Sequence, residues 1–371
     1  MCNTTVNPEP IIEPDDEVGD DLESSLGTDF ASSSSSLRSS ILSYRQENGR
    51  TYHQYKDGSK ATFAVDLIDW VLIRRLEYNM PNDDLECERL GDFQPPSRFV
   101  MRKHLLKPDL QHHLFILTLD GRLGLAPPND PDSKVKRVLD VGTGTGIWAV
   151  DFGDEHPEAQ VIGVDLSPIQ PSFVPPNVEF FVDDIEEPWS FSQPFDYIHS
   201  RMMTFSIKSW PEYIRKIYDN LAPGGYVELV EIDLKNKSDD GTLTEHHELS
   251  RLVRLLDEAS IKIGRRFQDN RKNKDILRDT GFVDIVETTF KWPSGPWPRE
   301  KKYKELGQWS NANMDAYQGL EALVMAAFTR VLGWTHEEVI VHLATVRKEL
   351  ADKRIHTYWS IYSTYGRRPL E

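Results

Sequence analysis

The segment from Lys136 to Asp165 limits the possible folds of this chain more than any other part of the sequence. A mostly apolar run over 138–141 leads into three glycines at alternate positions, and a short amphipathic segment follows. A second apolar run then ends at Asp165. This order predicts a strand, a tight turn, a helix and a second strand with an acid at its tip. The three glycines are Gly142, Gly144 and Gly146.

Glycines in such a turn let the backbone approach a ligand closely, because a Cβ atom would occupy that space. The helix that begins at the turn points its unpaired N–H groups toward the same place. Asp165, at the tip of the second strand, is placed to accept hydrogen bonds from both hydroxyls of a ribose. We interpret the segment as a pocket for a nucleoside cofactor at the carboxyl ends of parallel strands. The alternative is a glycine-rich turn without a ligand.

The residues around the turn indicate which nucleoside cofactor to expect. The spacing is Gly-x-Gly-x-Gly followed by Ile147, whereas a dinucleotide site calls for Gly-x-Gly-x-x-Gly, which disfavours a nucleotide-dependent oxidoreductase. Asp140, two residues before the first glycine, would repel a pyrophosphate but suits the ammonium group of an amino acid. A ligand with an amino-acid end and a ribose end is S-adenosylmethionine, which we expect as the cofactor.

Strands and helices alternate along the chain at the rhythm of a doubly wound sheet. A third strand over 178–182 ends at Asp183 and Asp184, where an acid can accept the exocyclic amine of adenine. Helical spacing over about 300–352 precedes a last strand at 356–365. The sequence therefore predicts an α/β fold, with a Rossmann-like, seven-stranded, mostly parallel sheet and helices on both faces. An N-terminal helical arm and a helical insertion before the last strand complete the prediction.

Composition divides the chain into three parts. Residues 1–40 combine an acidic run with a serine run, which predicts a disordered tail that is either regulatory or only solubilising. Residues 41–135 are expected to form an N-terminal arm and helical cap, and residues 136–371 the domain that holds the cofactor. A polar segment that contains Tyr52 could close over the pocket or dock as a surface arm.

Charge and cysteine content restrict the class of partner. The net charge of −17 argues against a nucleic-acid backbone, since such partners call for a basic surface. Two cysteines, Cys2 and Cys87, cannot build a disulfide framework and indicate a reducing compartment. We find neither a signal peptide nor an apolar run that approaches the ~20 residues needed to span a bilayer. We therefore expect a cytoplasmic protein that acts on a small molecule, without a membrane partner.

Two side chains at the exit of the fourth strand are candidates for the chemistry. His199 is the candidate general base, and the alternative is a strand-end histidine hydrogen-bonded to the loop. Arg201 could orient an acceptor carboxylate or phenolate, or pair with Asp196. Glu231, near the end of the fifth strand, is a weaker candidate. We expect no metal, because adjacent histidines point apart on a helix and no further ligands complete a set.

Several motifs together carry a resemblance to a known family. They are the glycine turn with its flanks, a Pro-Gly-Gly-Tyr-Val-Glu run and a late Tyr-Gly-Arg, at 138–148, 164–171, 223–228 and 365–367. From about residue 45 to its end, the chain resembles the class I S-adenosylmethionine-dependent methyltransferases. Within that class it resembles the fungal LaeA-like, or UMTA-type, group.

The resemblance implies a role for each matching residue. The glycine turn would lie along the methionine and ribose of the cofactor, and Asp140 would contact the amino group directly or through water. Asp165 would hold the ribose, Asp183 or Asp184 the adenine, and Tyr52 would belong to an arm over the pocket. The predicted cofactor-binding set is Asp140, Gly142, Thr143, Gly144, Gly146, Asp165, Leu166, Asp183, Asp184 and Tyr52.

Two stretches, 61–77 and 91–108, interrupt the otherwise matching sequence. They are either insertions near the substrate entrance or introns retained in the gene model.

The resemblance leaves two functions open. The first is an O- or N-methyltransferase that acts on a small molecule of secondary metabolism. The second is a LaeA-like nuclear regulator that binds the cofactor and acts through protein partners. The acidic tail favours the second function, and the lack of a basic nuclear signal favours the first.

Overall fold

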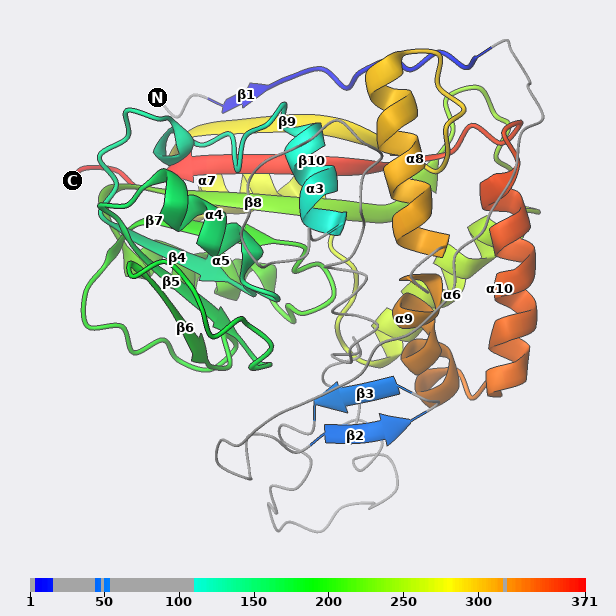
Figure 1. Ribbon diagram of the computed structural model, residues 1–371, viewed down its shortest axis with the longest axis horizontal. Coiled ribbons are helices and arrows are strands. Elements are labelled where there is room, and N and C mark those ends of the chain that lie inside the picture. Colours follow the sequence, from blue (N-terminus) through cyan, green and yellow to red (C-terminus); the bar gives the residue numbers. More distant parts are fainter. Residues whose placement is uncertain (1–3, 16–43, 48–49, 54–109, 316–318) are drawn as a thin grey trace.

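The computed structural model describes residues 4–15, 44–47, 50–53, 110–315 and 319–371 (Figure 1). The two interrupting stretches, 61–77 and 91–108, lie outside the described residues, as does most of the predicted N-terminal tail. Two short strands, β2 (Tyr44–Glu47) and β3 (Arg50–His53), pair antiparallel in a separate two-stranded sheet.

A mixed sheet of eight strands forms the centre of the described chain, in the order β1-β9-β10-β8-β7-β4-β5-β6. Its strands β4 to β8 are parallel, and β10 is antiparallel to both of its neighbours. The predicted Rossmann-like, mostly parallel sheet is therefore confirmed. The strand order reverses between β4 and β7, which is where open α/β sheets bind ligands. The bounds are β4 (Arg137–Val141), β5 (Gln160–Asp165), β6 (Val178–Val182), β7 (Phe195–Arg201), β8 (Leu221–Lys237), β9 (Val283–Pro293) and β10 (Tyr358–Arg367).

The sheet has one strand more than the seven predicted, because the N-terminal segment joins it. Strand β1 (Thr4–Val6) pairs parallel with β9 at the sheet edge. Beyond β1 the chain continues along this edge, where the N–H of Asp15 donates to the carbonyl of Trp297 at 2.8 Å. Ile12 is buried. The prediction of a disordered tail is thus wrong for residues 4–15, because part of their backbone is hydrogen-bonded to the sheet edge and the side chain of Ile12 is buried.

Helices cover both faces of the parallel strands, as predicted. On one face, Trp148 and Phe152 of α4 pack against Val138 of β4. On the other face, Ile214 of α5 packs against Leu139, because successive side chains of a strand point to opposite sides. The helices are α3 (Leu110–Thr118), α4 (Ile147–Glu155), α5 (Trp210–Asn220) and α7 (Asn273–Thr280), with 3-10 turns at Pro127–Asn129 and Asn270–Lys272.

A group of helices packs at the end of the sheet where β8 finishes (Figure 1). They are α6 (Glu248–Lys262), α8 (Lys301–Asp315), α9 (Gly319–Ala326), a π-helix (Ala327–Val331) and α10 (His336–Ala351). All but α6 fall between β9 and β10, which confirms the predicted helical insertion before the last strand. Thr335 caps α10 in a capping box with Glu338.

Glu228 of β8 is a fully buried carboxylate that holds the loop after α3 against the sheet. It accepts hydrogen bonds from the N–H groups of Leu125 and Ala126 at 2.8 and 3.0 Å, and from the hydroxyls of Tyr197 and Ser363 at 2.9 and 2.8 Å. Burial, together with Glu228, raises the pKa of Tyr197 well above its usual value, so this hydroxyl remains a donor. A buried charge needs such donors to offset its lost hydration.

Glu231 of the same strand holds a second loop, the one that follows β7. Its carboxylate accepts from the N–H groups of Met203 and Thr204, both at 2.9 Å, and from the Thr204 hydroxyl at 2.6 Å. Burial raises the pKa of Glu231 to about 7, and these hydrogen bonds oppose the shift. The side chain is fully buried, so the predicted weak catalytic role gives way to a structural one.

We predict that Glu228→Ala lowers the free energy of unfolding by about 3 kcal/mol or more, because it leaves several buried donors without an acceptor. Urea denaturation measures the change. Glu179→Ala, at an exposed position of β6, is the matched control and should stay within about 0.5 kcal/mol of wild type. Equal stabilities for the two variants would contradict this account of Glu228.

We also predict that the free energy of unfolding depends on pH because of Glu231. Its pKa is raised in the folded chain, from 4.5 to about 7, so the folded state binds the proton more tightly than the unfolded state does. The free energy of unfolding of the wild type should therefore fall as pH rises from about 4.5 to 7, by about 3 kcal/mol relative to Glu231→Gln. Parallel pH profiles for the two proteins would refute the assignment.

Candidate functional site

The three predicted glycines form the turn between β4 and α4, and all three have positive φ angles, of 68°, 56° and 82°. A Cβ on Gly142 would collide with the Sδ of Met203, and one on Gly146 with the ring of Phe180. A Cβ on Gly144 would meet no atom of the described residues within 4 Å. Packing thus explains two of the glycines, while Gly144 borders open space at the N-terminus of α4, where a ligand can approach the backbone.

Asp165 lies beside Gly144, as the sequence predicts. One carboxylate oxygen accepts from the N–H of Gly144 at 2.9 Å, and the other from the N–H of Ser167 at 3.0 Å. Burial raises the pKa of Asp165, and these N–H groups oppose the shift. Each carboxylate oxygen has a second lone pair, so the side chain can still accept from two ribose hydroxyls. Leu166 follows, half-buried.

The structure brings Asp140, Thr143 and His199 together beneath the turn. The carboxylate of Asp140 accepts from the Thr143 hydroxyl at 2.6 Å, and its other oxygen lies 2.7 Å from His199 Nδ1. Asp140 is 3% exposed, so both of its oxygens are used inside the protein. The arrangement fixes the base of the turn and sets one negative charge below it.

His199 is buried and is not exposed at the carboxyl end of the sheet. Its ring stacks on Trp148 with centroids 3.7 Å apart and planes 4° apart, and the side chain is 1% exposed. Burial lowers the pKa of His199, and Asp140 opposes the shift, so a neutral ring donates its Nδ1–H to the carboxylate. Its Nε2 is buried without a hydrogen-bond partner among the described residues. This geometry matches the strand-end alternative rather than a base that contacts an acceptor.

Arg201 lies at the end of β7 and contacts α3. Its guanidinium stands 4.6 Å from the ring centroid of Phe115 and 3.3 Å from Nδ1 of His112. His112 in turn reaches Asp151 of α4, with Nε2 to Oδ2 at 3.0 Å. Asp196, the alternative partner considered for Arg201, instead accepts the N–H groups at the start of β4.

The two acids after β6 occupy the neighbouring strand tip. The N–H of Asp183 donates to the carbonyl of Asp165 at 3.0 Å, which places the acid pair next to Asp165. Asp183 is exposed, while Asp184 is half-buried and accepts from the N–H of Glu186 at 2.9 Å. Tyr52 lies in β3, in the separate two-stranded sheet, so its contact with the pocket stays a prediction.

Sequence reasoning missed residues that reach the turn from loops. Gln170 donates to the carbonyl of Gly144 at 2.6 Å and so holds the turn from the loop after β5. Met203 covers Gly142, held there by Glu231. The only sequence signal for these residues is that each follows the tip of a parallel strand.

Two further features bear on the class of site. No group of three or more His, Cys, Asp or Glu side chains that could bind a metal occurs among the described residues. In the same part of the chain, no helix has the length and apolar character needed to cross a bilayer.

Comparison with known proteins gives the family. A family model described as a methyltransferase domain matches residues 110–287. Methyltransferase pytC of Aspergillus terreus is 39% identical over 359 residues, which cover 96% of this chain and 98% of pytC. The secondary metabolism regulator LAE1 of Cochliobolus heterostrophus is 36% identical over 330 residues, 87% of this chain and 94% of that one.

One solved structure is a Haemonchus contortus phosphoethanolamine N-methyltransferase 2 in complex with S-adenosyl-L-methionine. It aligns at 22% identity and a TM-score of 0.38, over 63% of this chain and 49% of that chain. Because pytC aligns with almost the whole chain, and LAE1 with most of it, this protein belongs to the fungal LaeA-like group of S-adenosylmethionine-dependent methyltransferases, whose cofactor is S-adenosylmethionine.

Proposed function

We propose that this protein transfers a methyl group from S-adenosylmethionine to an oxygen or nitrogen atom of a small-molecule secondary metabolite. The observation that carries the proposal is the open space at Gly144 beside Asp165, at the carboxyl edge of the parallel strands. The similarity to pytC, a methyltransferase that aligns over 98% of its length, supports the same reaction class. We infer a cytoplasmic location for this activity.

The residues around the turn fit the cofactor. We infer that the backbone from Gly142 to Gly146 lies along its methionine and ribose, and that Asp165 accepts from the ribose hydroxyls. Asp183 or Asp184 is assigned to the adenine amine, and Leu166 to the adenosyl contact. The negative charge of Asp140, held by Thr143 and His199, favours the ammonium end from below the turn.

The cofactor, when bound, supplies a sulfonium methyl group that is ready for in-line displacement. The chain's own task is to align the acceptor atom behind that methyl and to exclude water. We assign His199 to positioning Asp140, since its buried ring cannot reach an acceptor without repacking Trp148. Arg201, at the edge of the crevice, is assigned to orienting the acceptor through its position between α3 and β7.

A regulatory role is the second candidate, favoured by the similarity to LAE1 and to a secondary metabolism regulator, laeA of Aspergillus fumigatus. The latter is 33% identical over 88% of this chain and 77% of its own length. In this role the protein would act in the nucleus through protein partners. Comparing the metabolites of a deletion strain with the wild type separates the two roles. If one compound that lacks a single methyl group accumulates in the deletion strain, the protein acts as an enzyme. If the production of many secondary metabolites is silenced, it acts as a regulator.

We predict that Gly144→Asp weakens binding of S-adenosylhomocysteine at least about 100-fold, because a charged side chain would enter the space next to the ligand. Isothermal titration calorimetry measures the affinity. Gly333→Asp is the matched control, since Gly333 also has positive φ, of 75°, and no atom of the described part of the chain lies within 4 Å of its Cβ position. It should bind S-adenosylhomocysteine as the wild type does. Unchanged affinity in Gly144→Asp would refute the pocket.

Transfer itself is tested with the purified protein, methyl-labelled cofactor and an extract of the host. The enzymatic role predicts label in a small organic molecule, and Gly144→Asp should remove that label while Gly333→Asp retains it. Label found only in protein would contradict the proposed acceptor class.

A further inference from the structure

Arg201 occupies the position of β7 that lies beside the start of the glycine turn. In the parallel pair of β4 and β7, Asp140 stands opposite His199. The same register, continued by two residues, places Arg201 about 5 Å across the sheet from Gly142. Because side chains of a strand alternate between its faces, Arg201 projects from the same face as His199, one level nearer the carboxyl end. The strand order reverses between these two strands, so Arg201 lies where such sheets bind ligands.

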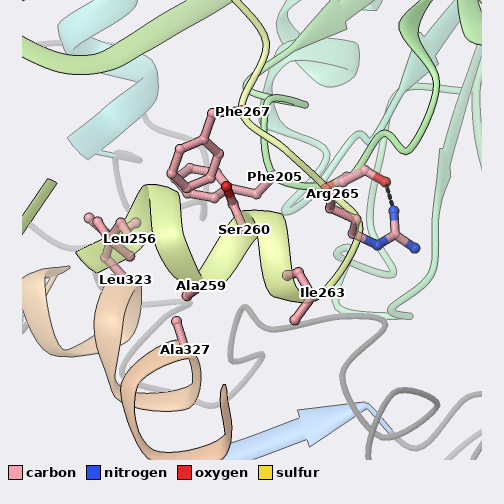
Figure 2. A pocket seen from close by; sticks show the side chains of 10 residues that line it. Phe205, Leu256, Ala259, Ser260, Ile263, Arg265, Phe267, Leu323 and Ala327 are labelled. Atoms are coloured by element: carbon pink, nitrogen blue, oxygen red, sulfur yellow. Dashed lines mark hydrogen bonds between the residues drawn. The ribbon is translucent and has the colours of Figure 1, made fainter. Parts of the chain in front are cut away.

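A cavity elsewhere in the fold is too small to hold a methyl acceptor. It lies beside α6, with Phe205, Phe267 and Arg265 in its lining (Figure 2). Its volume is about 30 Å³, which takes no more than a few water molecules. An organic acceptor therefore does not fit there, which favours the carboxyl ends of β4 and β7, where Arg201 lies.

His112 of α3 contacts the guanidinium of Arg201 and has a defined protonation pattern. Both terminal nitrogens of Arg201, Nη1 and Nη2, lie 3.3 Å from His112 Nδ1. A guanidinium can only donate, so Nδ1 has to be the unprotonated nitrogen of the imidazole. The other ring nitrogen, Nε2, then carries the hydrogen and donates it to Asp151 Oδ2 at 3.0 Å. The ring is therefore neutral, and its tautomer is set by its two partners.

The three side chains of this contact come from three elements, α3, α4 and β7. His112 is buried, and Phe115, about one turn further along α3, places its ring centroid 4.6 Å from the guanidinium carbon. One helix thus confines the guanidinium with a ring nitrogen and an aromatic face. The side chain of Asp151 is 42% exposed, so its contact with His112 adds little to stability. Its effect is to orient the imidazole.

We propose that His112 is a positioning residue for methyl transfer, whose neutral ring, oriented by Asp151, holds the guanidinium of Arg201 beside the glycine turn. The inference rests on the proposed function, in which Arg201 orients the acceptor, and adds the residues that hold Arg201 in place. Without the Nδ1 acceptor, the long side chain of Arg201 samples other rotamers. The acceptor is then misaligned with the methyl group, and transfer slows.

Two amide variants of the full chain separate this role from a merely structural one. Counted in bonds from the backbone, the amide oxygen of His112→Asn stands where Nδ1 stood and can accept from Arg201. The amide nitrogen of His112→Gln stands where Nε2 stood and can donate to Asp151. We expect His112→Asn to retain at least about half of the wild-type transfer rate and His112→Gln to lose about tenfold, because only the first keeps an acceptor for Arg201. His113→Asn is the matched control, since this neighbouring ring packs on Trp309 instead, and its rate should stay within about twofold of wild type.

Transfer is measured with methyl-labelled cofactor and a dilution series of host extract, and binding of S-adenosylhomocysteine by calorimetry. The affinity for S-adenosylhomocysteine should change less than about twofold in all three variants, because Arg201 acts on the acceptor. Nitrogen NMR of the wild type with labelled histidine reads the tautomer of His112 without any acceptor. We expect hydrogen on Nε2 and none on Nδ1.

Several results would overturn the role of His112. Faster transfer by His112→Gln than by His112→Asn would assign the residue to the tie between α3 and α4 instead. Equal rates in the two variants, or a hydrogen on Nδ1 in the wild type, would also contradict it. If the variants do not fold, the tautomer of the wild type decides. A wild type that transfers no label would refute the proposed function itself, which is distinct from a failure of His112, since that leaves the wild type active.

Discussion

The site depends on two buried carboxylates of one strand, Glu228 and Glu231. They stand three positions apart on β8, so they point to opposite faces of the sheet. Glu228 ties the loop after α3 to one face, and Glu231 ties the loop after β7 to the other. A buried carboxylate without donors would be strongly unfavourable, so each loop is held by the need to supply them. The second of these loops carries Met203, which packs against the Gly142 position of the glycine turn.

The sequence predicted those features of the fold that neighbouring residues determine. The turn at 142–146 requires backbone angles that favour glycine, and the alternation of strands and helices around it leaves few topologies. The edge strand β1 could not be found in this way. It is three residues long, and its partner in β9 lies some 280 residues away, so nothing near it in sequence marks it as a strand. Its acidic surroundings indicated disorder instead.

His199 shows why a catalytic role was harder to predict than a binding site. The sequence pattern of a histidine at a strand end is the same whether its side chain faces the ligand or the core. Its place is decided by Trp148, which arrives from α4 and covers the ring, and by Asp140 on the neighbouring strand. Asp165, by contrast, is the last residue of its strand, so the strand end itself directs it to the crevice.

One ion pair joins the loop after β6 to the chain that follows α6. Glu186 lies two residues after Asp184, to whose carboxylate its N–H donates, and its own carboxylate binds Arg265 and the N–H of Lys208. Arg265 follows α6 and also donates to the carbonyl of Ser206, in the loop after β7. Because Arg265 is buried, a shift of either loop would leave its charge without a partner, which is strongly unfavourable. The loops after β6 and β7 are therefore tied to the end of α6 through Glu186 and Arg265, and a shift of one of the three segments would disturb the other two.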